Sequence, residues 1–250
     1  MKKKLLLIIF NLFFTTVFSQ NIEIEVDYEI QGYFKDFNNF NMENLKSKNF
    51  KHILNELNEI DKVYEREIDF DVFETKYDFE VKYLSNKSVH YLHYKITILK
   101  EKDSIIGLIC YENVRKKIDY YFDYEVIQNI IEKHNDFYVT KSDISDFVNG
   151  FTNEYTYGYA CGNSPNIEKT PSYNGYMYND KRNLNEFRKL LKSYNIENQN
   201  YGLDAIEFLN KSGKVKLNED DRKIIEHIKK RNSLLNTCSG CNVGIYEKRF

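Results

Sequence analysis

The chain lacks the short motifs that mark several common classes of enzyme. It contains no G-x-S-x-G segment, so the sequence offers no nucleophile elbow of the kind that serine hydrolases use. It has 10 glycines but no glycine-rich loop of the kind that holds a phosphate group. None of its five histidines has a serine or cysteine and an acid in a recognisable triad context. Nucleophilic hydrolysis and cofactor chemistry therefore have no sequence motif here, and we expect no cofactor.

An excess of positive charge and a long apolar run are also missing. Lysine and arginine number 36 against 38 acids, and the formal net charge is −2. Nucleic-acid binding needs clustered lysines and arginines, so we expect no nucleic-acid partner. The longest apolar run, Leu5 to Phe18, is shorter than the roughly 20 residues that span a bilayer. We therefore expect no membrane span in the mature protein.

This run, preceded by three lysines, has the form of an export signal. Lys2, Lys3 and Lys4 give the positive start, and Val17-Phe18-Ser19 ends the run with residues that suit signal peptidase. Cleavage is predicted near Ser19-Gln20. No cysteine stands at the end of the run, so a lipid-anchored N-terminus is not expected. Residues 1–19 are predicted to be a signal peptide, and the mature protein to be secreted or periplasmic.

The overall composition indicates a folded protein and suggests a lineage. Hydrophobic residues make up 42% of the chain and aromatic residues 16%, which is ample material for a core. The chain is rich in Lys, Asn, Ile, Tyr and Phe, and has two prolines and no tryptophan. Together with the Phe-Ser-Gln end of the signal, this composition resembles that of secreted proteins of the Bacteroidetes (Flavobacterium-like) group. The resemblance implies a lineage and no activity.

Hydrophobic periodicity predicts an α+β fold, with residues 20–151 forming an antiparallel sheet flanked by helices. Apolar residues at every second position predict strands, and those at helical spacing predict helices. The continuous apolar run from Ile105 to Tyr111 predicts a central strand that is buried on both faces. The predicted strands are 22–30, 77–83, 92–98 and 105–111, and the predicted helices are 42–60, 124–133 and one that begins at Ser142 or Asp143.

The rest of the chain is predicted to be a connection at 152–181 and a compact three-helix unit at 182–250. Glycine and proline cluster among tyrosines and asparagines in the connection. Asn218 is a predicted N-cap for the third helix, with Asp221 at N3, and Gly213 is predicted to end the second. The pair of helices at 182–209 resembles a single HEAT-type helical hairpin. A solenoid needs about three repeats, and no second copy is present, so an orthogonal bundle docked on the sheet is the favoured prediction.

Four cysteines offer the clearest chemistry in the sequence. Cys110 lies in the most apolar strand and is predicted to be free and buried. In an oxidising compartment Cys161, Cys238 and Cys241 are candidates for a disulfide. The Cys238-x-x-Cys241 spacing also fits a redox dithiol or half of a zinc site. A redox cysteine needs a helix N-terminus after it, and a zinc site needs two more ligands, so a structural disulfide is favoured.

Histidines give no metal site by spacing. His90 and His93 lie three residues apart in a predicted strand, so their side chains point to opposite faces and cannot share one ion. We predict no metal site.

A tyrosine-rich segment is the remaining candidate for a binding surface. Tyrosines interleaved with glycine and asparagine are typical of recognition loops, although codon bias and packing of rings between sheet and helices explain them more simply. The leading hypothesis is an exported, non-catalytic binding or interaction module for an unknown protein or surface ligand. The alternative is a thiol-disulfide oxidoreductase that uses Cys238 and Cys241. The candidate binding residues are Tyr157, Tyr159, Tyr173 and Tyr176.

Overall fold

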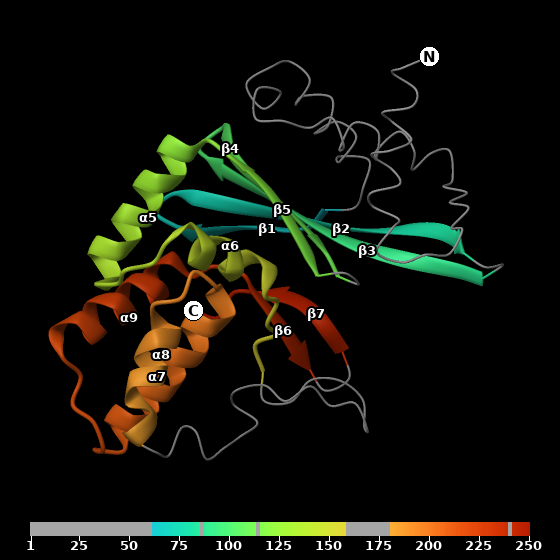
Figure 1. The fold of residues 1–250 in the computed structure, drawn as a ribbon. Coiled ribbons are helices and arrows are strands. Elements are labelled where there is room, and N and C mark those ends of the chain that lie inside the picture. The colour runs from blue at the N-terminus through green and yellow to red at the C-terminus, as the bar shows by residue number, and fades with distance from the viewer. Residues whose placement is uncertain (1–61, 86–87, 114–115, 159–180, 240–241) are drawn as a thin grey trace.

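The structure, a computed structural model, describes residues 62–85, 88–113, 116–158, 181–239 and 242–250, without the side chains of 79–85, 88–90, 92 and 239. The predicted signal, strand 22–30 and helix 42–60 lie outside these residues, as does most of the predicted connection. The described part is an antiparallel sheet with helices against one face and further helices below it (Figure 1). The predicted α+β class is confirmed.

The sheet is a five-stranded antiparallel meander, in which the spatial order of the strands follows their order in the chain. Strands β2, β3 and β4 contain the three strands that the sequence predicts in this region. The sequence pattern predicts neither β1 nor β5, which form the two edges of the sheet. The strands are β1 (Lys62–Asp69), β2 (Val72–Ser85), β3 (Ser88–Glu101), β4 (Ser104–Glu112) and β5 (Lys117–Phe122).

Strand β4 lies between β3 and β5 and is buried along most of its length. Residues 106–110 are all buried, which confirms the burial on both faces that its continuous apolar run predicts. Cys110 in this strand is a free, buried cysteine, as predicted. Burial, together with the charge of Asp119, raises the pKa of its thiol to about 12, so the thiol is unreactive at neutral pH.

Strands β1 and β2 are joined by a two-residue turn without glycine. Phe70 and Asp71 have φ angles of 50° and 61°, the left-handed pair that a type I′ hairpin requires. Bulky residues adopt this conformation at a cost in energy. The carboxylate of Asp69 accepts a hydrogen bond from the backbone N–H of Phe70 at 3.2 Å and helps to hold the turn.

Two helices cover one face of the sheet, namely α5 (Tyr124–Tyr138) and α6 (Ile144–Thr152). The predicted start of the second helix is confirmed, because Asp143 is its N-cap and accepts hydrogen bonds from Ser145 N and Asp146 N. Apolar side chains of both helices pack against those of the sheet. The main members of this core are Ile68, Val72, Leu99, Ile109, Phe122, Ile127, Ile131, Phe147 and Phe151.

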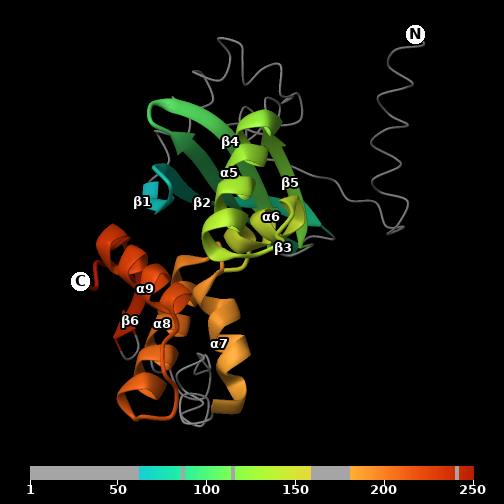
Figure 2. The ribbon, with the colours of Figure 1, turned by 90° about the vertical axis from the view of Figure 1, so that its left-hand side faces the viewer.

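The C-terminal unit holds the three predicted helices and an additional hairpin. Its elements are η1 (Lys181–Asn183), α7 (Leu184–Leu191), α8 (Ile196–Lys211), α9 (Glu219–Arg231), β6 (Leu235–Ser239) and β7 (Asn242–Glu247). Asn218 and Asp221 form the predicted capping box of α9, and α8 ends two residues before Gly213. Figure 2 shows α7, α8 and α9 below the sheet. No helix in the described ranges has the length and apolarity needed to cross a membrane.

Helices α7 and α8 approach each other closely at Gly202. A Cβ atom at this position would lie 2.7 Å from the carbonyl oxygen of Phe187 and still closer to the backbone nitrogen of Leu191. Both obstacles are main-chain atoms, so they cannot move aside as a flexible side chain would. Glycine is therefore needed at this helix crossing, although it is unfavourable inside a helix.

Replacing Gly202 with alanine is expected to destabilise the protein, although glycine to alanine normally stabilises a helix. Overpacking at the crossing should lower the free energy of unfolding by about 1–3 kcal/mol. Urea denaturation measures the change, with Asn210→Ala on the exposed side of the same helix as the control. A Gly202→Ala variant as stable as the wild type would contradict the close approach.

Candidate functional site

A buried group of charges joins the sheet to the C-terminal unit. Arg66 on β1 and Glu74 on β2 are cross-strand partners, so their side chains lie on the same face of the sheet. The Nε atom of Arg66 donates to Glu74 at 2.5 Å, and its Nη1 and Nη2 atoms donate to Glu197 of α8 at 2.5 and 3.2 Å. All three side chains are buried. We call these three residues the Arg66 network.

The Arg66 network also holds the backbone that leads into β6. Arg66 Nη1 donates to the carbonyl oxygen of Leu234 at 2.9 Å, and Glu197 accepts from the backbone N–H of Asn236 at 2.9 Å. Burial by itself would lower the pKa of Arg66, but the charges of Glu197 and Glu74 raise it well above its usual value. The guanidinium is therefore charged, and it is the cation that two buried carboxylates share.

A second buried cluster centres on Asp69, at the end of β1. Its carboxylate accepts from the hydroxyl of Tyr138 at 2.7 Å and lies 2.6 Å from Nε2 of His227. Nη1 of Arg231 is 3.4 Å away. Burial would raise the pKa of Asp69, but the hydrogen bond with His227 and the charge of Arg231 lower it below its ordinary value. We call Asp69, Tyr138, His227 and Arg231 the Asp69 cluster.

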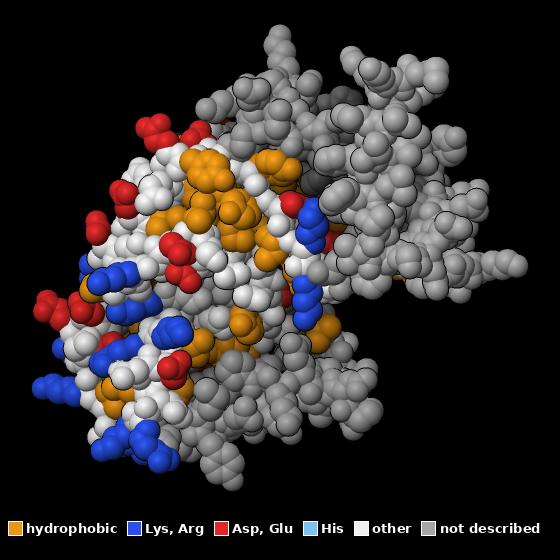
Figure 3. Space-filling model, viewed as in Figure 1, with side chains coloured by type: hydrophobic (Ala, Val, Ile, Leu, Met, Phe, Trp, Pro, Cys, Tyr) orange, Lys and Arg blue, Asp and Glu red, His pale blue; other side chains and the backbone are white. Residues whose placement is uncertain are grey.

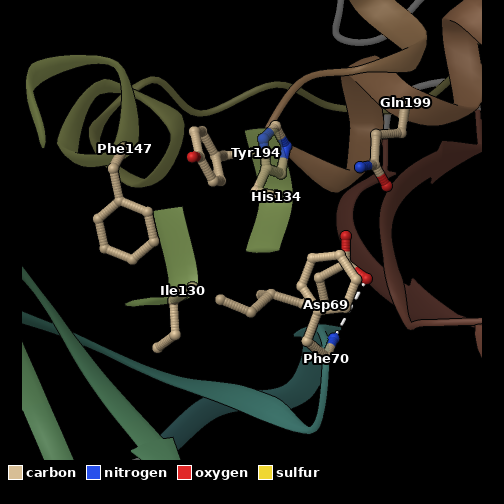
Figure 4. Close-up of a pocket in the computed structure, with 8 residues that line it drawn as sticks. Asp69, Phe70, Ile130, His134, Phe147, Tyr194 and Gln199 are labelled. Carbon is tan, nitrogen blue, oxygen red and sulfur yellow. Dashed lines mark hydrogen bonds between the residues drawn. The ribbon is translucent and has the colours of Figure 1, made fainter. Parts of the chain in front are cut away.

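A small cavity lies beside the Asp69 cluster. It is lined by Ile68, Asp69, Phe70, Ile130, His134, Phe147, Tyr194 and Gln199, which come from β1 and its turn, α5, α6, α8 and the connection between α7 and α8 (Figure 4). Its volume is about 10 Å³, which is the threshold for one water molecule. The cavity is therefore too small for an organic substrate.

His134 forms part of the cavity wall and is held neutral. Its ring stacks on Tyr194, with centroids 3.9 Å apart, and its Nδ1 atom lies 3.4 Å from the hydroxyl of Thr140. The residue is 1% exposed. Burial lowers the pKa of His134 to about 4, against an opposing effect of the Asp69 charge. An uncharged imidazole thus packs between aromatic rings.

The Asp69 and His227 pair has the geometry of an oriented general base. Aspartate beside one ring nitrogen of a histidine is how many hydrolases set the tautomer of the base. The ring of His227 also stacks on that of Phe70 in the turn, with centroids 5.8 Å apart. The pair therefore serves to bind α9 to the turn between β1 and β2.

An aromatic surface lies at the opposite edge of the sheet, along β5. Tyr120 is 38% exposed and Tyr124, at the start of α5, is 58% exposed. Both rings contact buried Phe122, with centroids 5.0 and 6.3 Å away. Figure 3 shows hydrophobic surface in the region of β5 and the start of α5. We call the exposed rings of Tyr120 and Tyr124, with half-buried Ile118, the β5 aromatic surface.

The sequence pattern that could have revealed this surface covers a single short strand. Ile118, Tyr120 and Phe122 alternate with polar or half-buried residues, as in a half-buried strand. Six residues that begin with a lysine and include an aspartate give too weak a pattern to stand out in a chain with 21 tyrosines.

Of the four predicted binding tyrosines, the structure describes Tyr157 alone. Its backbone N–H donates to Asn236 at 2.7 Å, its hydroxyl donates to Asp204, and its ring lies 5.1 Å from that of Tyr201. Its side chain is half-buried against the C-terminal unit. Tyr159, Tyr173 and Tyr176 lie outside the described residues, so their role stays a prediction.

The structure describes one of the three cysteines predicted to form a disulfide. Cys238 lies on β6, within a hairpin that the sequence does not predict. Cys161 and Cys241 lie outside the described residues, so the disulfide stays a prediction. Among the described residues, no group of three or more His, Cys, Asp and Glu side chains is placed to hold a metal ion.

Comparisons with known proteins assign no family. No family model, curated protein or solved structure matches this chain. Its function is therefore inferred from its own geometry.

Replacing Arg66 with methionine should be strongly destabilising. The change leaves Glu74 and Glu197 buried without their shared cation, and breaking one partner of a buried ion pair costs about 3–5 kcal/mol. Urea denaturation at neutral pH measures the loss. Lys62→Met on the same strand is the control, because its pair with Glu65 is exposed and should contribute at most about 1 kcal/mol. Equal losses in the two variants would show that the Arg66 network has no special role.

His134 should make the protein less stable in mild acid. Its folded pKa of about 4 lies below the ordinary value of 6.5, so only the unfolded chain gains a proton as the pH falls between these values. Stability is full above about pH 6.5 and should fall by about 3 kcal/mol by pH 4. Urea denaturation of wild type and His134→Phe across this range measures the difference between their slopes, with exposed His93→Gln as the control. Parallel slopes for wild type and His134→Phe would contradict the assignment.

Proposed function

We propose that this protein is exported and acts as a non-catalytic binding module for a protein partner. The observation that carries the proposal is the β5 aromatic surface, where Tyr120 and Tyr124 are exposed beside an edge strand. Exposed tyrosines on a rigid support are typical of protein-binding surfaces, because they bury a large area at a small cost in side-chain entropy.

The support beneath this surface is well packed. Phe122 is fully buried, and its ring contacts Phe147 of α6 with centroids 5.9 Å apart. Tyr120 and Tyr124 therefore rest on a residue that the core holds in place. A partner that covers these rings meets a surface that is already ordered, which limits the entropy lost on binding.

The alternative function, thiol-disulfide exchange, has less support. In redox C-x-x-C motifs the first cysteine stands at a helix N-terminus, which lowers its pKa, whereas Cys238 lies on strand β6. We propose instead that Cys238 forms a structural disulfide with Cys241 or Cys161 after export.

Affinity capture from the exported fraction of the producing cells tests the binding function. The wild-type chain should retain a protein saturably, and the double variant Tyr120→Ser, Tyr124→Ser should lose it. Removing two interface tyrosines typically weakens binding by about 2 kcal/mol or more. The retained protein is identified by mass spectrometry, and untagged copies of the chain itself are counted.

The matched control replaces two exposed apolar residues of the C-terminal unit, Phe208→Ser and Val243→Ser, which are 44% and 57% exposed. This variant should retain the same protein as the wild type. Circular dichroism confirms that all three proteins are folded. If the tyrosine variant retains the protein as well as the control does, the proposed surface is wrong.

A further inference from the structure

The two edges of the sheet differ in how they are covered. Along β1, the carbonyl oxygen of Glu67 accepts from Ser233, Arg66 reaches across to Leu234, and two irregularities interrupt the pairing with β2. Bulges and covering segments are ways in which proteins block an edge strand. Strand β5 pairs with β4 without a bulge, and in the described part of the chain no strand pairs with its outer side.

The hydrogen-bond pattern shows which groups of β5 face outward. The backbone N–H of Asp123 donates to the carbonyl oxygen of Ile106 at 2.8 Å, which extends the β4 and β5 ladder by one residue. Backbone direction alternates along an antiparallel strand, so residues 117, 119 and 121 bond to β4. Ile118, Tyr120 and Phe122 then direct their N–H and C=O groups away from the sheet.

We propose that the partner of the β5 aromatic surface is a second copy of this chain, joined by antiparallel pairing of β5 with β5 about a two-fold axis. The inference rests on the proposed function and names its partner. It joins two five-stranded sheets into one continuous sheet and removes the open edge from both copies.

Of the three registers centred on residues 119, 120 and 121, in the middle of the interface, one satisfies both the pleat and the charges. Residues that oppose each other in an antiparallel pair lie on the same face, so a residue of even number must oppose another of even number. Pairing centred on Asp119 opposes two aspartates, and pairing centred on Tyr121 opposes Asp119 with Asp123. Pairing centred on Tyr120 avoids both repulsions.

The register centred on Tyr120 also places complementary groups together. Each Tyr120 ring lies opposite its counterpart, Ile118 opposes Phe122, and Lys117 opposes Asp123 of the second copy. The outward groups of Ile118, Tyr120 and Phe122 then form the hydrogen bonds between the copies. Each copy contributes the same residues to the interface, as a two-fold axis requires.

The surroundings of Lys117 and Asp123 within one copy suit a contact between these residues of different copies. Lys117 has a half-exposed side chain that lies 2.8 Å from Asp119 of its own strand. Asp123 occupies the N-cap position of α5 but makes no side-chain capping hydrogen bond. An aspartate at this position ordinarily caps the helix, so its carboxylate is left for a cation outside the helix.

Charge reversal tests the dimer on the purified mature chain. Lys117→Glu alone opposes glutamate with aspartate, and Asp123→Lys alone opposes two lysines, so each variant should dimerise roughly tenfold more weakly than the wild type. In a mixture of the two variants, the introduced glutamate opposes the introduced lysine, and the native Lys117 of one copy opposes the native Asp123 of the other. A heterodimer should therefore form at the wild-type affinity. Sedimentation equilibrium measures the three cases over a dilution series from millimolar to micromolar.

The mixing experiment also controls for folding, because a misfolded variant could not be rescued by the other. A wild type that stays monomeric at millimolar concentration would overturn the inference, as would a dimer that neither reversal weakens or two weakened variants that do not associate on mixing. If the chain is monomeric while the tyrosine double variant still loses a captured protein, the binding function stands and the second copy is wrong. If neither dimer nor captured protein is found, both proposals fail.

Discussion

The buried contact of Arg66 with Glu74 and Glu197 is the interaction on which the rest of the structure depends. One guanidinium joins two strands of the sheet to the first turn of α8, and it also holds the backbone before β6. Each carboxylate would be costly to bury without the cation. The three charges are therefore stable only together, and they fix the C-terminal unit against one particular stretch of β1 and β2.

The apolar core also joins the sheet to the C-terminal unit. Ile196 at the start of α8 and Leu235 at the start of β6 belong to the same buried cluster as the residues of the sheet, α5 and α6. The Asp69 cluster adds α9 to this junction through His227 and Arg231. One edge of the sheet is thus used for contacts within the chain, whereas at the other edge no strand of the described residues pairs with the outer side of β5.

The sequence predicts the parts of the fold that a short stretch of chain specifies by itself. Strands β2, β3 and β4, the Asp143 and Asn218 caps and the burial of Cys110 all follow from local pattern. Strand β1 does not follow from local pattern. Arg66 and Asp69 are buried in it, whereas charged residues in a sequence suggest exposed positions. Their partners Glu197 and His227 lie 131 and 158 residues away, so no local pattern brings these side chains together. The β5 aromatic surface escapes prediction for a related reason, since its significance depends on β5 being an edge strand.

Native-state hydrogen exchange tests the central claim, that the Arg66 network makes the sheet and the C-terminal unit one cooperative structure. Slowly exchanging amides of β3 and of α8 are compared over a range of low urea concentrations. The account predicts that both sets exchange through the same global unfolding, with the same free energy and the same dependence on urea. Exchange of the α8 amides at a clearly lower free energy, while those of β3 stay protected, would show that the two parts unfold independently and would contradict it.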